Sequence, residues 1–228
     1  METNLDCVKI CVKICVKIGV MSTTSHPYHH GDLATALLDA AQDELADRGI
    51  EAFSLRGVAK RAGVSHAAPA HHFKDVQGLL TALAARGFDR FVQRQSEFRR
   101  RSGKDARSQL VASGLGYIVF ATENPALFRL MFGSTRTNFE DQHLGQAASR
   151  AYENLVVYVA QAKGMEISAV EDGRAMQDAD FMEEVAAAWA VAHGLADLLV
   201  AGRMESIAKL PTKARQAAIS AVLRRVIT

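Results

Sequence analysis

The sequence predicts an all-α protein. After residue 31, apolar residues recur every three or four positions, which is the period of an amphipathic helix. Glycine or proline stands at many of the segment boundaries, as expected where helices end and begin. Hydrophobic residues make up 49% of the 228 residues and charged residues 23%, a balance typical of a globular chain with a sizeable core. No apolar run is long enough to span a membrane.

The first 27 residues are predicted to form a tail ahead of the folded body. Residues 7–18 read CVKICVKICVKI, one tetrapeptide three times, and hold all three cysteines. A fourth metal ligand is missing and lysines interrupt each apolar run, so neither a zinc site nor a secretory signal is expected. Two alternatives stay open: a genuine disordered tail, or a mis-assigned start with translation beginning at Met21. The body lacks cysteine, and we expect a cytoplasmic protein without disulfides.

Four helices are predicted between residue 31 and about residue 100. Asp32 is placed to cap the first helix and Gly49 to end it. Ser54 and Ser65 cap a short second and third helix, which a glycine turn separates, and the third runs to residue 73. Asp75 caps a long fourth helix. Three short helices with a glycine turn before the third form a helix-turn-helix pattern. The predicted core positions are Leu33, Leu37, Leu38, Ala41, Leu45, Leu55, Val58, Ala59, Ala62, Leu79, Leu80, Leu83, Phe88 and Phe91.

Positive charge is concentrated in this region, although the formal net charge of the whole chain is only +2. Residues 53–74 include four Lys or Arg, three His and no carboxylate. A local positive field without opposing charge suits a phosphate backbone. The alternative is a solvated face. A metal site at His66, His71 and His72 is a weaker alternative, because His66 does not share one helical face with the other two and no carboxylate is near to orient a ligand.

The third helix has the side chains of a surface that reads DNA. Val64, Pro69 and Phe73 are predicted to point inward. Small outward residues let a helix approach base edges closely, alanine methyls can meet thymine methyls, and histidines can donate to bases or phosphates. The predicted outward positions are Ser65, His66, Ala68, Ala70 and His71. His72 has an open alternative as a purely structural residue next to Phe73.

The segment YHHGDL at residues 28–33, with FSLRGVAKRAGVSHAAPAHHF at residues 53–73, resembles the DNA-binding domain of TetR-type bacterial transcriptional regulators. The resemblance covers residues 28 to about 90 without a gap. It implies a DNA-binding domain over residues 28–91 and a helical effector-binding and dimerisation domain over residues 92–228. By matched position, the resemblance implies DNA contacts of four kinds. An arm that extends to His30 contributes Tyr28 and His29, and the second helix contributes Ser54 and Arg56. The implied reading surface consists of Ser65, His66, Ala67, Ala68, Ala70 and His71, and the implied phosphate contacts are His72 and Lys74.

Two residues depart from the pattern of this family. Ala70 stands where a tyrosine is usual, and Val76 stands where a lysine is usual, and both usual residues hold the DNA backbone. We expect Lys74 to compensate in part, and operator affinity to depend more on the arm at residues 28–30.

The second half is predicted to be helical as well. The sequence predicts an amphipathic helix over residues 109–122, a short apolar helix at PALFRLMFG over residues 125–133, and longer helices over residues 141–163, 178–203 and 212–226. Glu171 and Asp178 are placed in a polar loop. The last two helices are rich in Ala, Leu and Val. The resemblance implies that they pair with the same helices of a second subunit.

Trp189 and His193 are four residues apart and therefore share one helical face. An aromatic-lined cavity with one imidazole is a reasonable small-molecule pocket, and plain core packing is the alternative. With Gly194 and the upstream PALFRLMF, the two residues resemble the C-terminal domain of a TetR subgroup named for a Trp-His-Gly signature. The residues predicted to converge on this effector pocket are Tyr117, Phe120, Phe128, Met131, Phe132, Tyr158, Trp189 and His193.

The sequence favours a DNA-binding repressor that a small-molecule effector releases from its operator. We expect a homodimer that binds double-stranded DNA, with no cofactor, no metal and no membrane partner. An enzyme is disfavoured because phosphate-loop, G-x-S-x-G and H-E-x-x-H patterns are missing, and Glu183 and Glu184 diverge on one helix. The second alternative is a helical protein-interaction module with a degenerate helix-turn-helix, which Ala70 and Val76 favour.

Overall fold

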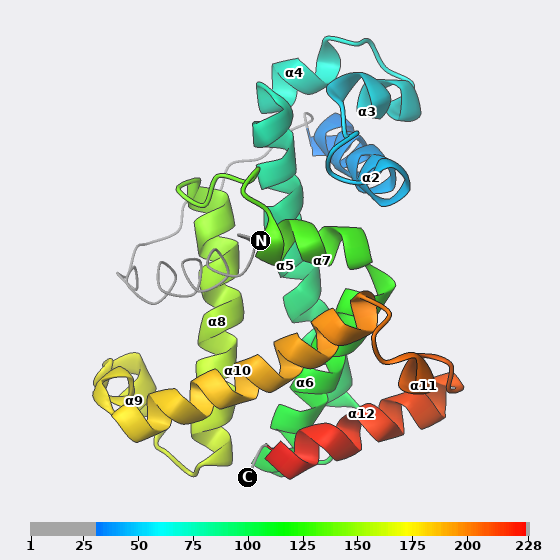
Figure 1. The fold of residues 1–228 in the computed structure, drawn as a ribbon. Coiled ribbons are helices and arrows are strands. Elements are labelled where there is room, and N and C mark those ends of the chain that lie inside the picture. Colours follow the sequence, from blue (N-terminus) through cyan, green and yellow to red (C-terminus); the bar gives the residue numbers. More distant parts are fainter. Residues whose placement is uncertain (1–30, 227–228) are drawn as a thin grey trace. The chain divides into compact units, whose positions relative to one another are not determined.

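The structure is a computed structural model that describes residues 31–226 (Figure 1). Every regular element in this range is a helix, so the predicted all-α fold is confirmed for it. No helix of the described part is long and apolar enough to cross a membrane. The predictions for the CVKI repeat, for Met21 and for the arm at Tyr28 and His29 fall outside the described residues.

The first half holds α2 (Gly31–Arg48), α3 (Leu55–Ala62), α4 (Ala68–Phe73) and α5 (Val76–Arg100). The second half holds α6 (Ala106–Glu123), α7 (Pro125–Gly133), α8 (Gln142–Ala162), α9 (Ile167–Glu171), the 3-10 helix η1 (Arg174–Gln177), α10 (Ala179–Val200), α11 (Glu205–Ala208) and α12 (Thr212–Val226). The five longer helices predicted here are present, whereas α9, η1 and α11 were not predicted. Glu171 therefore ends a short helix and does not lie in a loop.

The described residues form two compact units. The first consists of residues 31–89 and 124–149, and the second of residues 90–123 and 150–226. The helices α5 and α8 each run from one unit into the other. The first unit thus includes α7 and the start of α8, which the sequence boundary at residues 91–92 assigns to the effector domain. As functional domains, residues 28–91 and 92–228 remain a prediction.

Local capping signals place most helix ends of the first unit as predicted. The Ser54 hydroxyl oxygen accepts a hydrogen bond from the Gly57 N–H at 3.1 Å, at the start of α3. The Asp75 carboxylate accepts one from the Gly78 N–H at 2.8 Å, at the start of α5. Gly49 follows α2 with a φ of +69°, a left-handed conformation that glycine adopts without steric cost.

Two predicted helix starts are wrong. The helix α2 already includes Gly31, so the predicted start at Asp32 is wrong. Ser65 does not cap the third helix, which begins three residues later at Ala68. Pro69 explains the shift, because it has no N–H to donate to the Ser65 carbonyl oxygen. The Ala68 N–H donates to that oxygen instead, at 3.1 Å, and closes a turn ahead of the helix.

The core of the first unit contains most of the predicted apolar positions, but Leu33, Leu38, Leu55 and Ala62 are only half-buried, and Phe91 is buried in the second unit. The buried side chains come from one face of α2, from α3, from α5 and from α7. In α7 the Phe132 ring packs edge-on against Phe88 of α5, with ring centroids 5.3 Å apart. The buried core residues named in the sequence analysis are Leu37, Ala41, Leu45, Val58, Ala59, Leu79, Leu80, Leu83 and Phe88.

In the second unit, α6 lies at the centre, and α10 and α12 both pack against it (Figure 1). The prediction that this helix is amphipathic is wrong, because its side chains from residue 110 to residue 121 are buried almost all round. A helix enclosed by other helices needs no polar face. Gly116 lets α5 and α6 approach closely, since a Cβ there would lie 2.8 Å from the Gln95 Cα and 3.1 Å from the Arg94 carbonyl oxygen.

Candidate nucleic-acid interface

The segment that contains α3 and α4 exposes most of the described side chains that the sequence assigns to DNA contact. Pro69 is buried, and Val64 and Phe73 are half-buried, so the three residues predicted to point inward do so to different degrees. Ser54, Ala68 and His72 are half-buried. The exposed members of the predicted set are Arg56, Ser65, His66, Ala67, Ala70, His71 and Lys74.

The chain turns sharply at Lys74, between α4 and α5. Lys74 has a φ of +69° and a ψ of −59°, and the Asp75 N–H donates to the Phe73 carbonyl oxygen at 2.8 Å. This is a γ-turn, a strained conformation for a residue with a Cβ. Within residues 31–226, Lys74 is the one non-glycine residue with a positive φ. The turn holds an exposed lysine two residues ahead of Val76, where the family pattern has its lysine.

The charge of this face differs from the sequence expectation because α2 supplies carboxylates. Arg61 of α3 donates to Glu44 and to Asp47, both at 2.6 Å. Side-chain hydrogen bonds from Arg61 to Glu44 and Asp47 raise the pKa of the guanidinium above its ordinary value. The expected absence of opposing charge is therefore wrong for Arg61. Among the described residues, the exposed cations Arg56, Lys60 and Lys74 of this segment have no carboxylate partner.

Glu44 fixes α3 against α2. Its side chain is only 8% exposed, and its carboxylate lies directly over Gly57. A Cβ on Gly57 would come 2.0 Å from the Glu44 Oε1, so a side chain at residue 57 would displace the Glu44 carboxylate from this position. Sequence analysis missed the contact, although a signal was present. Glu44 interrupts the apolar face of α2 between Ala41 and Leu45, where a carboxylate is expected to have a buried cationic partner.

The three histidines near the reading helix do not form a metal cluster. The rings of His71 and His72 meet edge-on with centroids 5.7 Å apart, and His72 also contacts Phe73. Throughout residues 31–226, no group of three or more His, Cys, Asp or Glu side chains is arranged to hold a metal ion.

The predicted effector residues fall into both units. In the second unit, the Tyr117 hydroxyl lies 2.7 Å from the His193 Nδ1, and the Phe91 ring contacts both Tyr117 and Phe120. Trp189 packs against Tyr152, a residue that the sequence did not single out. Phe128, Met131 and Phe132 are buried in the first unit.

The second unit also contains a polar seam between α5 and α6, defined here by Gln95, Arg99, Gln109 and Ser113. The Gln95 amide donates to the Ser113 hydroxyl at 3.1 Å, and both side chains are buried. The Gln109 amide donates to the Arg99 carbonyl oxygen at 3.0 Å. The Arg99 guanidinium carbon lies 3.5 Å from the centre of the Tyr158 ring, which is a cation–π contact. The seam pairs successive turns of two antiparallel helices.

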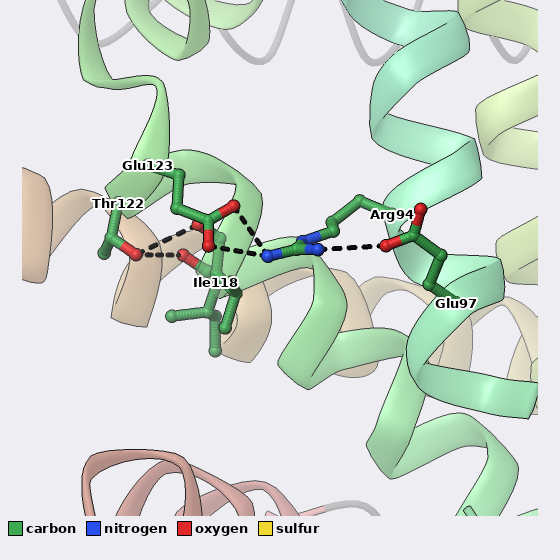
Figure 2. A network of polar contacts seen from close by, with 6 residues as sticks. Arg94, Glu97, Ile118, Thr122 and Glu123 are labelled. Carbon is green, nitrogen blue, oxygen red and sulfur yellow. Dashed lines mark hydrogen bonds and ion pairs between the residues drawn. The ribbon is translucent and has the colours of Figure 1, made fainter. Parts of the chain in front are cut away.

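Figure 2 shows an ion-pair network between α5 and α6. Arg94 of α5 donates to Glu97 at 2.9 Å and to both carboxylate oxygens of Glu123, at 2.6 and 2.8 Å. Burial lowers the pKa of Arg94, but its bonds to Glu97 and Glu123 outweigh this effect and raise the pKa overall. Glu123 is the last residue of α6, so a two-point bond joins the end of α6 to α5.

Comparisons with known proteins match both halves of the chain. A family model described as "Bacterial regulatory proteins, tetR family" matches residues 37–83. A second model, described as "Tetracyclin repressor-like, C-terminal domain", matches residues 110–225, which is more than half of the chain. Neither description decides the Trp-His-Gly subgroup. The comparison with curated proteins found no match.

Solved structures share the fold. A Rhodococcus sp. RHA1 protein described as having unknown function is 31% identical, with a TM-score of 0.66, and the alignment covers 90% of this chain and all of that one. A TetR-like transcriptional regulator from Rhodococcus sp. RHA1 is 18% identical, with a TM-score of 0.53 and coverage of 88% and 97%. The TetR family regulator PfmR from Thermus thermophilus is 20% identical, with a TM-score of 0.57 and coverage of 84% and 98%.

Proposed function

The chain belongs to the TetR family of bacterial transcriptional regulators, and on that premise we propose that it is a homodimeric repressor released from its operator by a small-molecule effector. The observation that carries the proposal is the exposed face of α3 and α4. That face presents small side chains, histidines and unpaired cations together, which suits a surface that approaches base edges and phosphates. We propose no catalytic role for the chain.

Each DNA contact has a proposed role. Arg56 reads a base or a phosphate at the start of α3, where the Ser54 hydroxyl is already engaged in capping. His66, Ala67, Ala70 and His71, with the neighbouring Ser65 and Ala68, enter the major groove. Lys74 binds a phosphate from its γ-turn, His72 supports a neighbouring phosphate, and Tyr28 and His29 form the arm.

The exposed faces of α10 and α12 support the homodimer. On α10, Ala186, Ala187 and Ala190 are exposed or half-buried, and on α12, Ala214, Ala217 and Ala221 are exposed or half-buried. Within residues 31–226, the exposed large hydrophobic side chains are Leu198 on α10 and Val226 on α12. Exposed apolar faces of this kind mark protein contacts. A two-fold dimer places two reading helices one DNA turn, or a multiple of it, apart.

We place the effector site in the second unit, around the bond between Tyr117 and His193. Phe91, Phe120 and the Trp189–Tyr152 contact supply aromatic surface there. The pairing of an imidazole with a tyrosine hydroxyl offers polar groups to orient a ligand. With Trp189, His193 and Gly194 on one helix, we propose that the domain belongs to the Trp-His-Gly subgroup. An effector acts through its different affinities for the DNA-bound and released states.

Fluorescence anisotropy tests the proposal. The full-length protein is titrated against a labelled duplex from upstream of its own gene and against a scrambled duplex, at several salt concentrations. We expect tighter binding to the first duplex and a steep loss of affinity with salt, because phosphate contacts release counterions. Equal, weak binding to both duplexes would favour the protein-interaction module instead.

A further inference from the structure

Residues 134–138, here named the strap, follow α7 and touch the chain on both sides of the helix-turn-helix. On one side, the Arg136 guanidinium donates a hydrogen bond to the carbonyl oxygen of Ile50, in the turn between α2 and α3. On the other side, the Asn138 N–H donates to the Thr81 Oγ1 in α5, at 2.9 Å. Ile50 precedes α3 and Thr81 follows α4. The strap therefore bridges the two flanks of the reading helices.

The buried Thr81 hydroxyl anchors the strap to α5. Thr81 is only 4% exposed, and its hydroxyl donates to the Gln77 carbonyl oxygen at 2.7 Å while it accepts from the strap. A buried hydroxyl that both donates and accepts a hydrogen bond closely defines the position of its partner. The strap also holds its own shape, because the Arg136 N–H donates to the Ser134 hydroxyl oxygen at 3.0 Å.

The helix ahead of the strap is held just as closely. A Cβ on Gly87 of α5 would lie 2.7 Å from the Met131 sulfur and 3.1 Å from the Leu127 Cδ1 of α7. Together with the contact between Phe88 and Phe132, this leaves α7 little freedom to slide along α5. The strap therefore starts from a fixed point before it reaches Ile50 and Thr81.

From these contacts we propose that the strap positions the reading helices α3 and α4, with Thr81 and Arg136 as positioning residues for operator binding. The inference rests on the proposed function and assigns these two residues no contact with DNA. The chain connects the strap to the second unit at both ends, through α6, which ends one residue before Asn124, and through α8. A rearrangement of α6 or α8 would therefore be transmitted along the chain to the strap, and through its hydrogen bonds to the two flanks of the reading helices.

The experiment compares full-length variants on a duplex that the wild-type protein has selected from a random library. Thr81→Val removes the hydroxyl at constant shape, Thr81→Ser keeps it, Arg136→Ala removes the donor and Arg136→Lys keeps the charge. Arg174→Ala removes an exposed arginine of the second unit as a charge-matched control. Affinity is measured for the selected and a scrambled duplex, and hydrogen exchange is measured for residues 49–57 without DNA.

We expect Thr81→Val and Arg136→Ala each to weaken binding to the selected duplex about three- to tenfold, the effect of one lost hydrogen bond. Scrambled-duplex affinity should stay unchanged and exchange at residues 49–57 should rise. The double variant should lose less than the product of the single losses, because both bonds hold one segment. Thr81→Ser and the control should behave like the wild type.

If hydrogen exchange and affinity for the selected duplex are unchanged in Thr81→Val and Arg136→Ala, the proposed positioning role of the strap is wrong. An equal loss for both duplexes in step with a lower melting temperature would also overturn it, since that pattern indicates general destabilisation. Failure of the wild type to select any duplex would instead contradict the proposed function. In that case the exchange measurement still decides whether the strap holds the flanks.

Discussion

Ion pairs join helices near the surface in both units, but in the second unit neutral polar side chains also pair in the interior. Arg61 links α3 to Glu44 and Asp47, and Arg86 links α5 to Asp39 at 2.7 Å. The second unit also has an ion pair between helices, Arg94 with Glu123, and in addition it buries the Gln95–Ser113 bond and brings Tyr117 to His193. Under the proposed function, the first unit presents an outer face to DNA, and the interior of the second unit offers polar groups to a small molecule.

The largest expected effect tests how closely the second unit is packed. Gly116→Ala should destabilise the protein by about 1–3 kcal/mol, because the new Cβ meets the backbone of α5 rather than a flexible side chain. Gly145→Ala in α8 is the matched control, since a Cβ there lies 3.8 Å from its nearest neighbour. We expect the control to be neutral or more stable by about 0.5 kcal/mol. Chemical denaturation measures both, and equal stabilities would show that the crossing is looser than described.

Substitution of two arginines of α3 distinguishes a proposed DNA contact, Arg56, from a residue that joins α3 to α2, Arg61. Arg56→Ala should weaken operator binding about tenfold and reduce the salt slope by about one, as expected for a residue that meets DNA. Arg61→Ala should lower the melting temperature but leave the salt slope unchanged, because its guanidinium is bound to α2. Anisotropy titrations at several salt concentrations measure both slopes. Identical slopes for the two variants would remove the distinction between paired and unpaired cations.

Two substitutions of Lys74 in the γ-turn distinguish the effect of backbone strain from the effect of the lysine charge. Lys74→Gly should raise stability by about 0.5–1 kcal/mol, because glycine accepts the positive φ that costs a residue with a Cβ. Lys74→Ala keeps the strain and should not be more stable than the wild type. Both variants should weaken operator binding to a similar degree, since both lose the cation. Thermal melts and anisotropy together check this, and wild-type affinity in both variants would exclude a phosphate contact at residue 74.

Tyr117→Phe probes the interior pair of the second unit. Loss of the hydroxyl removes the bond to His193 and should cost about 1 kcal/mol of stability, with operator affinity unchanged because the pair is remote in sequence and role from the reading face. Urea unfolding and anisotropy are the measurements. A clear change in operator affinity without any effector would show that this bond already sets the state of the DNA-binding helices.

The smallest expected effect concerns pH. The Asp105 carboxylate accepts a hydrogen bond from the Ser108 N–H at 2.8 Å, and this bond is the main cause of its lowered pKa. The folded state favours the charged form, so the stabilisation is present above the ordinary pKa of about 3.9 and is lost as the pH falls below it. Asp105→Asn should narrow the stability difference between neutral and acidic pH. An unchanged difference would assign the acid sensitivity to other groups.

Features set by neighbouring residues were predictable from the sequence. Ser54, Asp75 and Gly49 mark helix ends through local bonds and backbone conformation, and the Pro125–Gly133 helix was predicted to the residue. Local rules failed where one residue changed a bond pattern, as Pro69 did at the start of α4. They also failed at α6, because enclosure by α10 and α12 is a property of the whole unit.

The supporting contacts of the reading face could not be derived in the same way. Glu44 reaches Arg61 across 17 residues and Arg136 reaches Ile50 across 86. Neither pairing follows from helical spacing, since each depends on how the helices pack. Apart from Tyr28 and His29 in the arm, the predicted DNA-contact residues lie between Ser54 and Lys74, which is why the sequence could propose them as a group. The predicted effector residues are scattered over four helices, and the structure divides them between the two units.

The most direct test of the central idea is chemical protection of the operator. Dimethyl sulphate modifies the guanine N7, which lies in the major groove where the reading helices are proposed to enter. We predict two protected tracts, related by symmetry and one helical turn or a multiple apart, that disappear in the Arg56→Ala, His71→Ala double variant. Protection that persists in this variant, or that lacks the two-tract pattern, would contradict the assignment of α3 and α4 as the DNA-reading surface.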